Sequence, residues 1–188
     1  MNGYGIIMKM YDNKNAWHFL ELKDALFLGF CAVCIMMGKM VFHWNLHIPG
    51  HSMFFVMFFL LLAKGCVPYR FSAAFTGLLA GVMSLLVGMG TGGPVHLLKY
   101  IVPGLVLDGV CSIVSGVTMF YLRCILAAAI ASFSKFFGNA AVDWLVGMDT
   151  TVLLQHALLQ SLSAVGFGVA GSMLVVPVMH RLKAHGIV

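Results

Sequence analysis

The chain has 188 residues, of which 61% are hydrophobic and only 9% are charged, and its formal net charge is +5. Soluble domains carry about a quarter charged residues, so this composition argues against a water-soluble globular protein and indicates that lipid is the natural solvent. The glycine-rich phosphate-binding loop of ATPases does not occur in the sequence, which excludes ATP hydrolysis by that route. The positive charge is expected from membrane topology and does not indicate nucleic-acid binding.

The apolar segments predict an all-α integral membrane protein, a bundle of about six transmembrane helices. A span needs about 20 apolar residues, so six spans use the whole chain as a single transmembrane domain. Residues 1–16 lack the long apolar run of a cleavable signal peptide and are expected to form an amphipathic, interfacial lead-in. The spans that we expect cover residues 24–42, 52–67, 71–89, 95–114, 117–137 and 151–179.

Lysines and arginines near the span ends predict the orientation of the bundle. The three loops on one side, residues 43–51, 90–94 and 138–150, contain neither lysine nor arginine. Basic residues gather near the opposite ends of the spans, which predicts that both termini lie in the cytoplasm. Those basic residues are Lys9, Lys14, Lys23, Lys64, Arg70, Arg123, Arg181 and Lys183, whereas Lys39, Lys99 and Lys135 lie within spans near their outer ends.

Most residues suited to binding a ligand also gather at the predicted outer ends. Three histidines recur at a spacing of four residues from His43 to His51, and residues four apart share one face of a helix. Histidine is a common metal ligand, so His43, His47, His51 and His96 are candidate haem or metal ligands. The alternative is an interfacial belt of aromatic and polar residues. The full set of candidate ligand-binding residues is His43, Trp44, His47, His51, His96, Lys99, Asn139, Asp143 and Trp144.

Two ionisable residues of the fourth span are candidates because charges inside a membrane usually face the bundle interior. Lys99 lies near the outer end, where it either meets an anionic ligand group or extends to the lipid headgroups. Asp108 lies deeper and is expected to pair with Arg123. Cys31 and Cys34 have the spacing of a redox motif but lie in a continuous apolar segment, which favours a packing role.

Small residues recur along two spans at helical spacing. Ala25, Gly29 and Ala32 form one such stripe, and Gly77 and Gly81 form another. Small side chains let two helix backbones approach closely. Inside the bundle such stripes are ordinary packing, whereas on an exterior face they indicate docking to another membrane protein.

These features together resemble the substrate-binding S component of energy-coupling factor (ECF) transporters, over nearly the whole chain. The resemblance rests on the size, the six spans, the cytoplasmic termini, the stripe in span one, and a glycine-rich last span ending in Arg181-Leu182-Lys183. The stretches Ile48-Pro49-Gly50-His51 and Pro103-Gly104-Leu105-Val106-Leu107-Asp108 are the most similar.

The resemblance implies a multi-pass protein of a prokaryotic cell membrane that binds a micronutrient under its outer loops and is not itself an enzyme. It would dock, through Ala25, Gly29 and Ala32, on a transmembrane coupling protein bound to two ATPase subunits. No cofactor is required by the chain. Nickel and cobalt members begin Met-His, whereas this chain begins Met1-Asn2, which argues against that subgroup. The expected substrate is a vitamin, or haem or another metal-bearing tetrapyrrole, which the His-rich outer loop leaves open.

Two other functions stay open at this point. An integral membrane enzyme would need a nucleophile or metal motif, but Gly171-Ser172 with His180 lacks the pattern of a rhomboid protease, and no His-Glu-x-x-His occurs. A structural membrane subunit without a ligand would leave the outer residues as an aromatic belt.

Overall fold

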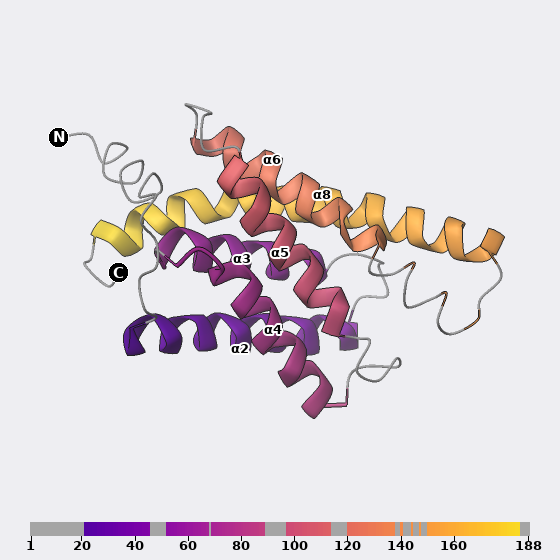
Figure 1. The fold of residues 1–188 in the computed structure, drawn as a ribbon, viewed down its shortest axis with the longest axis horizontal. Coiled ribbons are helices and arrows are strands. Elements are labelled where there is room, and N and C mark those ends of the chain that lie inside the picture. Colours follow the sequence, from indigo (N-terminus) through magenta and orange to yellow (C-terminus); the bar gives the residue numbers. More distant parts are fainter. Residues whose placement is uncertain are drawn as a thin grey trace.

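The computed structural model describes residues 21–45, 52–67, 69–88, 97–113, 120–137, 140, 144, 147 and 150–184. Within these residues the chain forms six helices and no strand, which confirms the predicted all-α class (Figure 1). The helices are α2 (Leu22–Asn45), α3 (Ser52–Cys66), α4 (Ser72–Leu86), α5 (Leu98–Ile113), α6 (Phe120–Phe133) and α8 (Thr150–Ala184).

Each helix lies in one of the six apolar segments, and local sequence explains several of the boundaries. α3 ends at Cys66, two residues before Pro68, because the residue preceding a proline disfavours helical backbone. α4 is followed by Gly88, whose φ of +73° is the left-handed conformation that commonly ends helices. The Gly88 amide donates to the carbonyl of Leu85 at 2.9 Å and so satisfies one carbonyl of the last turn.

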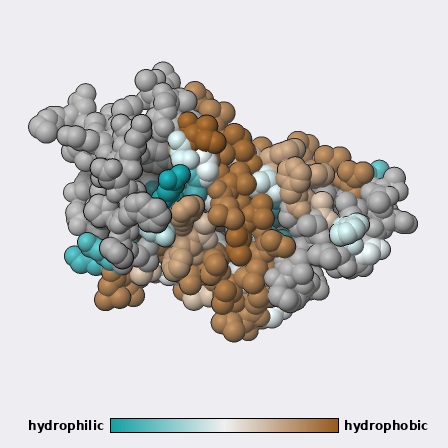
Figure 2. All heavy atoms as spheres, viewed as in Figure 1, coloured by the Kyte–Doolittle hydropathy of each residue, from teal (hydrophilic) through white to brown (hydrophobic). Residues whose placement is uncertain are grey.

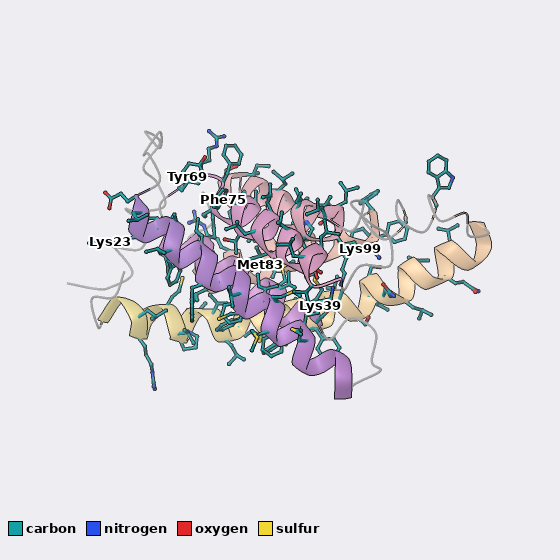
Figure 3. The ribbon with its side chains drawn as sticks, turned by 90° about the horizontal axis from the view of Figure 1, so that it is seen from below. Lys23, Lys39, Tyr69, Phe75, Met83 and Lys99 are labelled. Atoms are coloured by element: carbon teal, nitrogen blue, oxygen red, sulfur yellow. The ribbon has the colours of Figure 1, made fainter. Side chains whose placement is uncertain are left out.

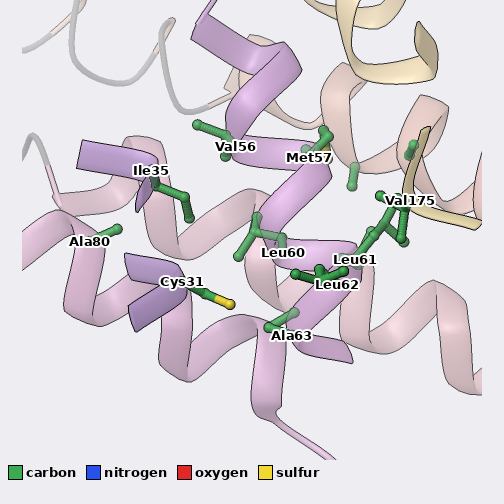
Figure 4. Packing of buried hydrophobic residues seen from close by; sticks show 14 of the residues in the cluster. Cys31, Ile35, Val56, Met57, Leu60, Leu61, Leu62, Ala63, Ala80 and Val175 are labelled. Atoms are coloured by element: carbon green, nitrogen blue, oxygen red, sulfur yellow. The ribbon is translucent and has the colours of Figure 1, made fainter. Parts of the chain in front are cut away.

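Helix α3 occupies the centre of the bundle. It packs against α8, α2, α4, α6 and α5, and none of its residues is exposed. Its buried side chains form the middle of one apolar core, together with residues such as Cys31 and Ile35 of α2, Ala80 of α4 and Val175 of α8 (Figure 4). The other helices therefore surround an apolar helix that has little contact with solvent.

Glycines allow the helices to approach closely in the interior. A Cβ added at Gly77 of α4 would lie 2.6 Å from the carbonyl oxygen of Tyr100 on α5, and one at Gly104 would lie 2.8 Å from the carbonyl oxygen of Ala73. At Gly171 of α8 a Cβ would lie 2.5 Å from the carbonyl oxygen of Phe54 on α3. The stripe that contains Gly77 and Gly81 is therefore internal packing.

The helices alternate in direction, so the bundle has two distinct ends (Figure 1). We call one the terminal end, where α2 begins, α3 ends close to the start of α4, and α8 ends. We call the other the loop end, where α2, α4 and α6 end and α3, α5 and α8 begin. The exposed charged residues among those described, Glu21, Lys23, Arg70 and Arg181, all lie at the terminal end. The first part of α8 extends past the other helices at the loop end.

The outer helices expose large apolar side chains along their length. Hydrophobic residues form a broad band across the middle of the face in Figure 2. Because the core beneath them is also apolar, these helices are hydrophobic on more than one side. Examples are Leu26 and Phe30 on α2, Leu78 on α4, Leu105 on α5, Leu126 and Ile130 on α6, and Leu162 on α8.

Helix length differs from the sequence-based expectation of six spans of similar size. Within the described residues, one helix contains a segment long and apolar enough to cross a membrane, Leu158–Met179 of α8. The apolar helices α3 and α4 have 15 residues each, or about 22 Å at 1.5 Å per residue. Parts of the predicted spans, such as 89, 95–96 and 114, lie outside the described residues.

Candidate ligand-binding site

Two of the nine predicted ligand-binding residues have described side chains. Lys99 lies in the first turn of α5 and is half-buried, whereas Trp144 is 70% exposed. His43 and Trp44 belong to the last turns of α2, but their side chains are not described. The predictions for His47, His51, His96, Asn139 and Asp143 lie outside the described residues.

Metal binding by the histidines therefore stays a prediction. Among the described side chains, no group of three His, Cys, Asp or Glu residues is placed to hold a metal ion. The five cysteines lie in helices as free thiols, with Cys31 buried in the core and Cys34 half-buried. Their positions match packing between helices.

An ion pair lies near the terminal end, between Lys64 of α3 and Asp108 of α5. The Lys64 Nζ and the Asp108 Oδ1 are 2.7 Å apart, and the two side chains are only 11% and 3% exposed. Lys64 also donates to the carbonyl oxygen of Arg70 at 2.5 Å. The partner of Asp108 is thus Lys64, whereas the sequence had favoured Arg123.

The same carboxylate caps a helix in a different segment of the chain. The Asp108 Oδ2 accepts a hydrogen bond from the backbone amide of Ala74 at 2.8 Å. Ala74 lies in the first turn of α4, where backbone amides have no partner within the helix and the helix dipole favours negative charge. Asp108 therefore joins the end of α3, the start of α4 and α5, which is a structural role.

A second polar group lies toward the loop end and connects three helices. Lys39 of α2 donates a hydrogen bond through Nζ to the hydroxyl of Tyr100 on α5, and its Nζ lies 4.9 Å from the centre of the Tyr100 ring. The Tyr100 hydroxyl in turn donates to the Ser84 Oγ of α4 at 3.2 Å. Tyr100 is 5% exposed and Ser84 is fully buried. These contacts hold the Lys39 ammonium against the bundle.

Two further lysines belong to the same region. Lys99 precedes Tyr100 on α5, and Lys135 follows α6 after a single turn residue. Lys135 lies within electrostatic range of both Lys39 and Lys99. All three are half-buried. Figure 3 shows Lys39 and Lys99 toward the same end of the molecule, away from Lys23 and Tyr69.

The predicted site did not include Lys39, Lys135, Tyr100 or Ser84. The sequence offered one signal for Lys39, Lys99 and Lys135, because all three lie in apolar segments near the predicted outer ends. Whether such a lysine points inward or toward lipid depends on the rotation of its helix about its axis. Tyr100 carried no signal, since a tyrosine in an apolar helix is common.

The predicted docking stripe on α2 is divided between the surface and the core. Ala25 and Gly29 are half-buried, and a Cβ added at Gly29 would meet nothing within 4 Å. Ala32 is fully buried in the core. Its methyl group therefore contributes to packing within the bundle and is not presented to a partner.

Comparisons with protein-family models, with curated proteins and with solved structures find no match for this chain. Assignment of a function therefore rests on the sequence and on the geometry of the two charged groups.

Proposed function

We propose that the chain is a multi-pass membrane protein that binds a solute at its loop end and serves as the S-type subunit of an ECF-type importer. The observation that carries this proposal is the contrast between an apolar exterior and a polar group of Lys39, Tyr100 and Ser84 held inside the loop half of the bundle. A bilayer explains the exterior, since soluble monomers rarely expose large apolar patches.

Helix lengths are compatible with a bilayer. α2 and α8, with 24 and 35 residues, extend about 36 Å and 52 Å, more than the hydrocarbon thickness of about 30 Å. Shorter spans such as α4 are accommodated by local thinning of the bilayer. α3 is enclosed by other helices, so its length does not have to match the surrounding lipid.

The membrane topology is tested with a matched pair of cysteines at the two ends of α4. Arg70 and Val87 are both exposed and flank this helix. In a variant with the five native cysteines replaced by alanine, we expect a membrane-impermeant maleimide added to intact cells to label Val87→Cys and not Arg70→Cys. Labelling of both from outside would show that α4 does not cross the membrane.

The importer function requires partners because the sequence has no phosphate-binding loop to drive transport. The expected partners are a transmembrane coupling protein and two ATPase subunits. Reconstituted with them in vesicles, the chain is expected to support ATP-dependent uptake of its solute, and alone it is expected only to bind. Turnover of a compound by the isolated chain would favour a membrane enzyme instead. Neither binding nor turnover would favour a structural subunit.

The proposed substrate is a vitamin, or haem or another metal-bearing tetrapyrrole. An absorption spectrum with mass spectrometry of the chain purified in mild detergent separates these two classes. A Soret band lost on replacing His43, His47, His51 or His96 with alanine would support haem. A colourless protein carrying an organic vitamin would exclude the haem hypothesis while supporting the importer.

Docking on the coupling protein is proposed to use the surface around Ala25 and Gly29. Gly29→Leu would fill the open space on this face and is expected to abolish uptake while ligand binding persists. Gly166→Leu on α8 is the matched control, because this glycine is exposed and its Cβ would also meet nothing within 4 Å. Equal loss of uptake in both variants would argue against a docking role for α2.

A further inference from the structure

The turn between α3 and α4, at the terminal end, is held in place from inside the bundle. The Ser72 amide donates to the carbonyl oxygen of Tyr69 at 3.3 Å, which closes the turn. The Lys64 Nζ donates to the carbonyl oxygen of Arg70 at 2.5 Å, and Lys64 is itself fixed by its ion pair with Asp108. The backbone of this turn is therefore anchored to α3 and α5.

The side chains of the same turn face outward and place a cation among aromatic rings. Arg70 is exposed, and Phe71 is 49% exposed. The guanidinium carbon of Arg70 lies 5.9 Å from the centre of the Phe71 ring, within the range of a cation–π contact. The Tyr69 ring meets the Phe71 ring edge-on, with their centres 6.4 Å apart. A fixed backbone thus presents one guanidinium and an apolar ring side by side.

Phe71 is also the first residue of an exposed apolar face of α4. Phe75, Leu78 and Val82 continue it at spacings of four, three and four residues, and all three side chains are exposed. Figure 3 shows Tyr69 and Phe75 near the end of the molecule that carries Lys23. In the proposed topology this face of α4 contacts lipid hydrocarbon. Arg70 then lies just beyond the hydrocarbon, at the level of the headgroups of the inner leaflet.

We propose that Arg70 and Phe71 form a binding site for an anionic phospholipid of the inner leaflet. The guanidinium binds the headgroup phosphate, because its planar donors match phosphate oxygens in a bidentate geometry. The acyl chains lie along the apolar face of α4. Anionic lipids concentrate in the cytoplasmic leaflet, where basic residues near the surface attract them. This inference rests on the membrane topology of the proposed function and not on its import activity.

An acidic surface of a partner protein is the other occupant that an exposed arginine would fit. The apolar face that runs from Phe71 to Val82 favours lipid, because a lipid supplies a phosphate and a hydrocarbon chain in the same order along the helix axis. An acidic protein surface would match the arginine alone.

The test uses the full chain in mixed micelles of an uncharged detergent with either phosphatidylglycerol or phosphatidylcholine. The readout is the thermal unfolding midpoint, since a ligand that binds the folded state raises it. Inorganic phosphate in detergent alone, with sodium chloride at matched ionic strength, shows whether a free anion has the same effect.

We expect phosphatidylglycerol to raise the midpoint of the wild type above its value in phosphatidylcholine. In Arg70→Gln about tenfold more phosphatidylglycerol should be needed, as when a hydrogen bond to a charged group is lost. Arg70→Lys keeps the charge without the bidentate donors and should lose less. Lys23→Gln is the matched control, because Lys23 is another exposed basic residue at the terminal end, and it should respond within about twofold of the wild type. Because Arg70 is exposed, Arg70→Gln should unfold like the wild type in phosphatidylcholine, which separates loss of the site from misfolding.

The proposal is overturned if the two lipids give the wild type the same midpoint, if Arg70→Gln and Lys23→Gln respond alike, or if inorganic phosphate alone reproduces the effect. Loss of uptake in Arg70→Gln with an unchanged lipid response would assign the turn to a partner protein and also reject the lipid site. Failure of the proposed function is detected separately. Lipid binding without ATP-dependent uptake would keep the site and reject the importer, and the cysteine labelling of α4 tests the topology independently of lipid affinity.

Discussion

The two ends of the bundle differ in how their charged side chains are arranged. Near the terminal end, Lys64 and Asp108 neutralise each other at 2.7 Å, and the carboxylate also caps α4. Toward the loop end, Lys39, Lys99 and Lys135 bring like charges together. The first arrangement is complete within the described chain and is explained by stability. In the second, the Tyr100 hydroxyl holds the Lys39 ammonium against the bundle.

The largest effect is expected from breaking the complete pair. Asp108→Ala leaves the buried Lys64 without its carboxylate and removes the cap of α4. Loss of one partner of a buried ion pair costs about 3–5 kcal/mol of unfolding free energy. Denaturation of the purified chain in mixed detergent micelles measures this change.

Asp24→Ala is the control for this prediction, because Asp24 is a carboxylate in the first turn of α2. Its loss should cost less than about 1 kcal/mol, the scale of an interaction with the helix dipole. The double variant Lys64→Met/Asp108→Leu should recover much of the loss, since apolar residues often replace a buried pair at little cost. If Asp108→Ala is no more destabilising than Asp24→Ala, the pair does not stabilise the fold.

A smaller effect is expected where α4 and α5 touch between the two ends. Gly77→Ala places a methyl group 2.6 Å from the carbonyl oxygen of Tyr100, so the helices must separate. Overpacking of this kind costs about 1–3 kcal/mol. Thermal unfolding of the purified chain measures this change.

Gly109→Ala on α5 supplies the matched comparison for Gly77. Gly109 is exposed, and its Cβ would meet nothing within 4 Å. Alanine is favoured over glycine in a helix interior by about 0.5–1 kcal/mol, so this variant should be slightly more stable than the wild type. Similar effects of the two substitutions would contradict the close contact between α4 and α5.

Removal of a lysine is expected to change the unfolding free energy in opposite directions at the two ends. Lys135→Met removes one of three like charges, so it should increase the unfolding free energy by about 0.5–2 kcal/mol, the range typical of charge optimisation. Lys64→Met, which breaks the pair at the other end, should lower it. Thermal unfolding in chloride buffer compares the two. A loss of stability in Lys135→Met would mean that this lysine already has a stabilising partner.

The helices themselves were predictable from sequence, because apolar stretches and Pro68 act locally. Each of the six helices lies in a segment where one was expected, and α2 begins at the end where α8 finishes (Figure 1). The multi-pass topology stays a prediction.

The partners of the charged residues were not predictable in the same way. Lys64 and Arg123 were both basic residues near the predicted inner ends, and the crossing of α3 and α5 decides that Lys64 reaches Asp108. Similarly, Lys39 and Tyr100 are 61 residues apart, and they meet only because α2 and α5 both pack against α4. Such choices depend on the rotation of each helix, which hydropathy does not encode.

A further effect is expected at the hydroxyl that links Lys39 to Ser84. Tyr100→Phe removes both hydrogen bonds but keeps the ring beneath the Lys39 ammonium. The net loss of stability should be about 0.5–1.5 kcal/mol per hydrogen bond. Thermal unfolding of the purified chain measures this change.

Ser84→Ala separates the two roles of the hydroxyl. This variant removes the anchor of Tyr100 while the bond from Lys39 to the tyrosine can persist, so the loss of stability should be smaller than in Tyr100→Phe. If Tyr100→Phe is as stable as the wild type, the two hydrogen bonds do not stabilise the fold, and the contrast between the two ends would rest on Lys99 and Lys135 alone.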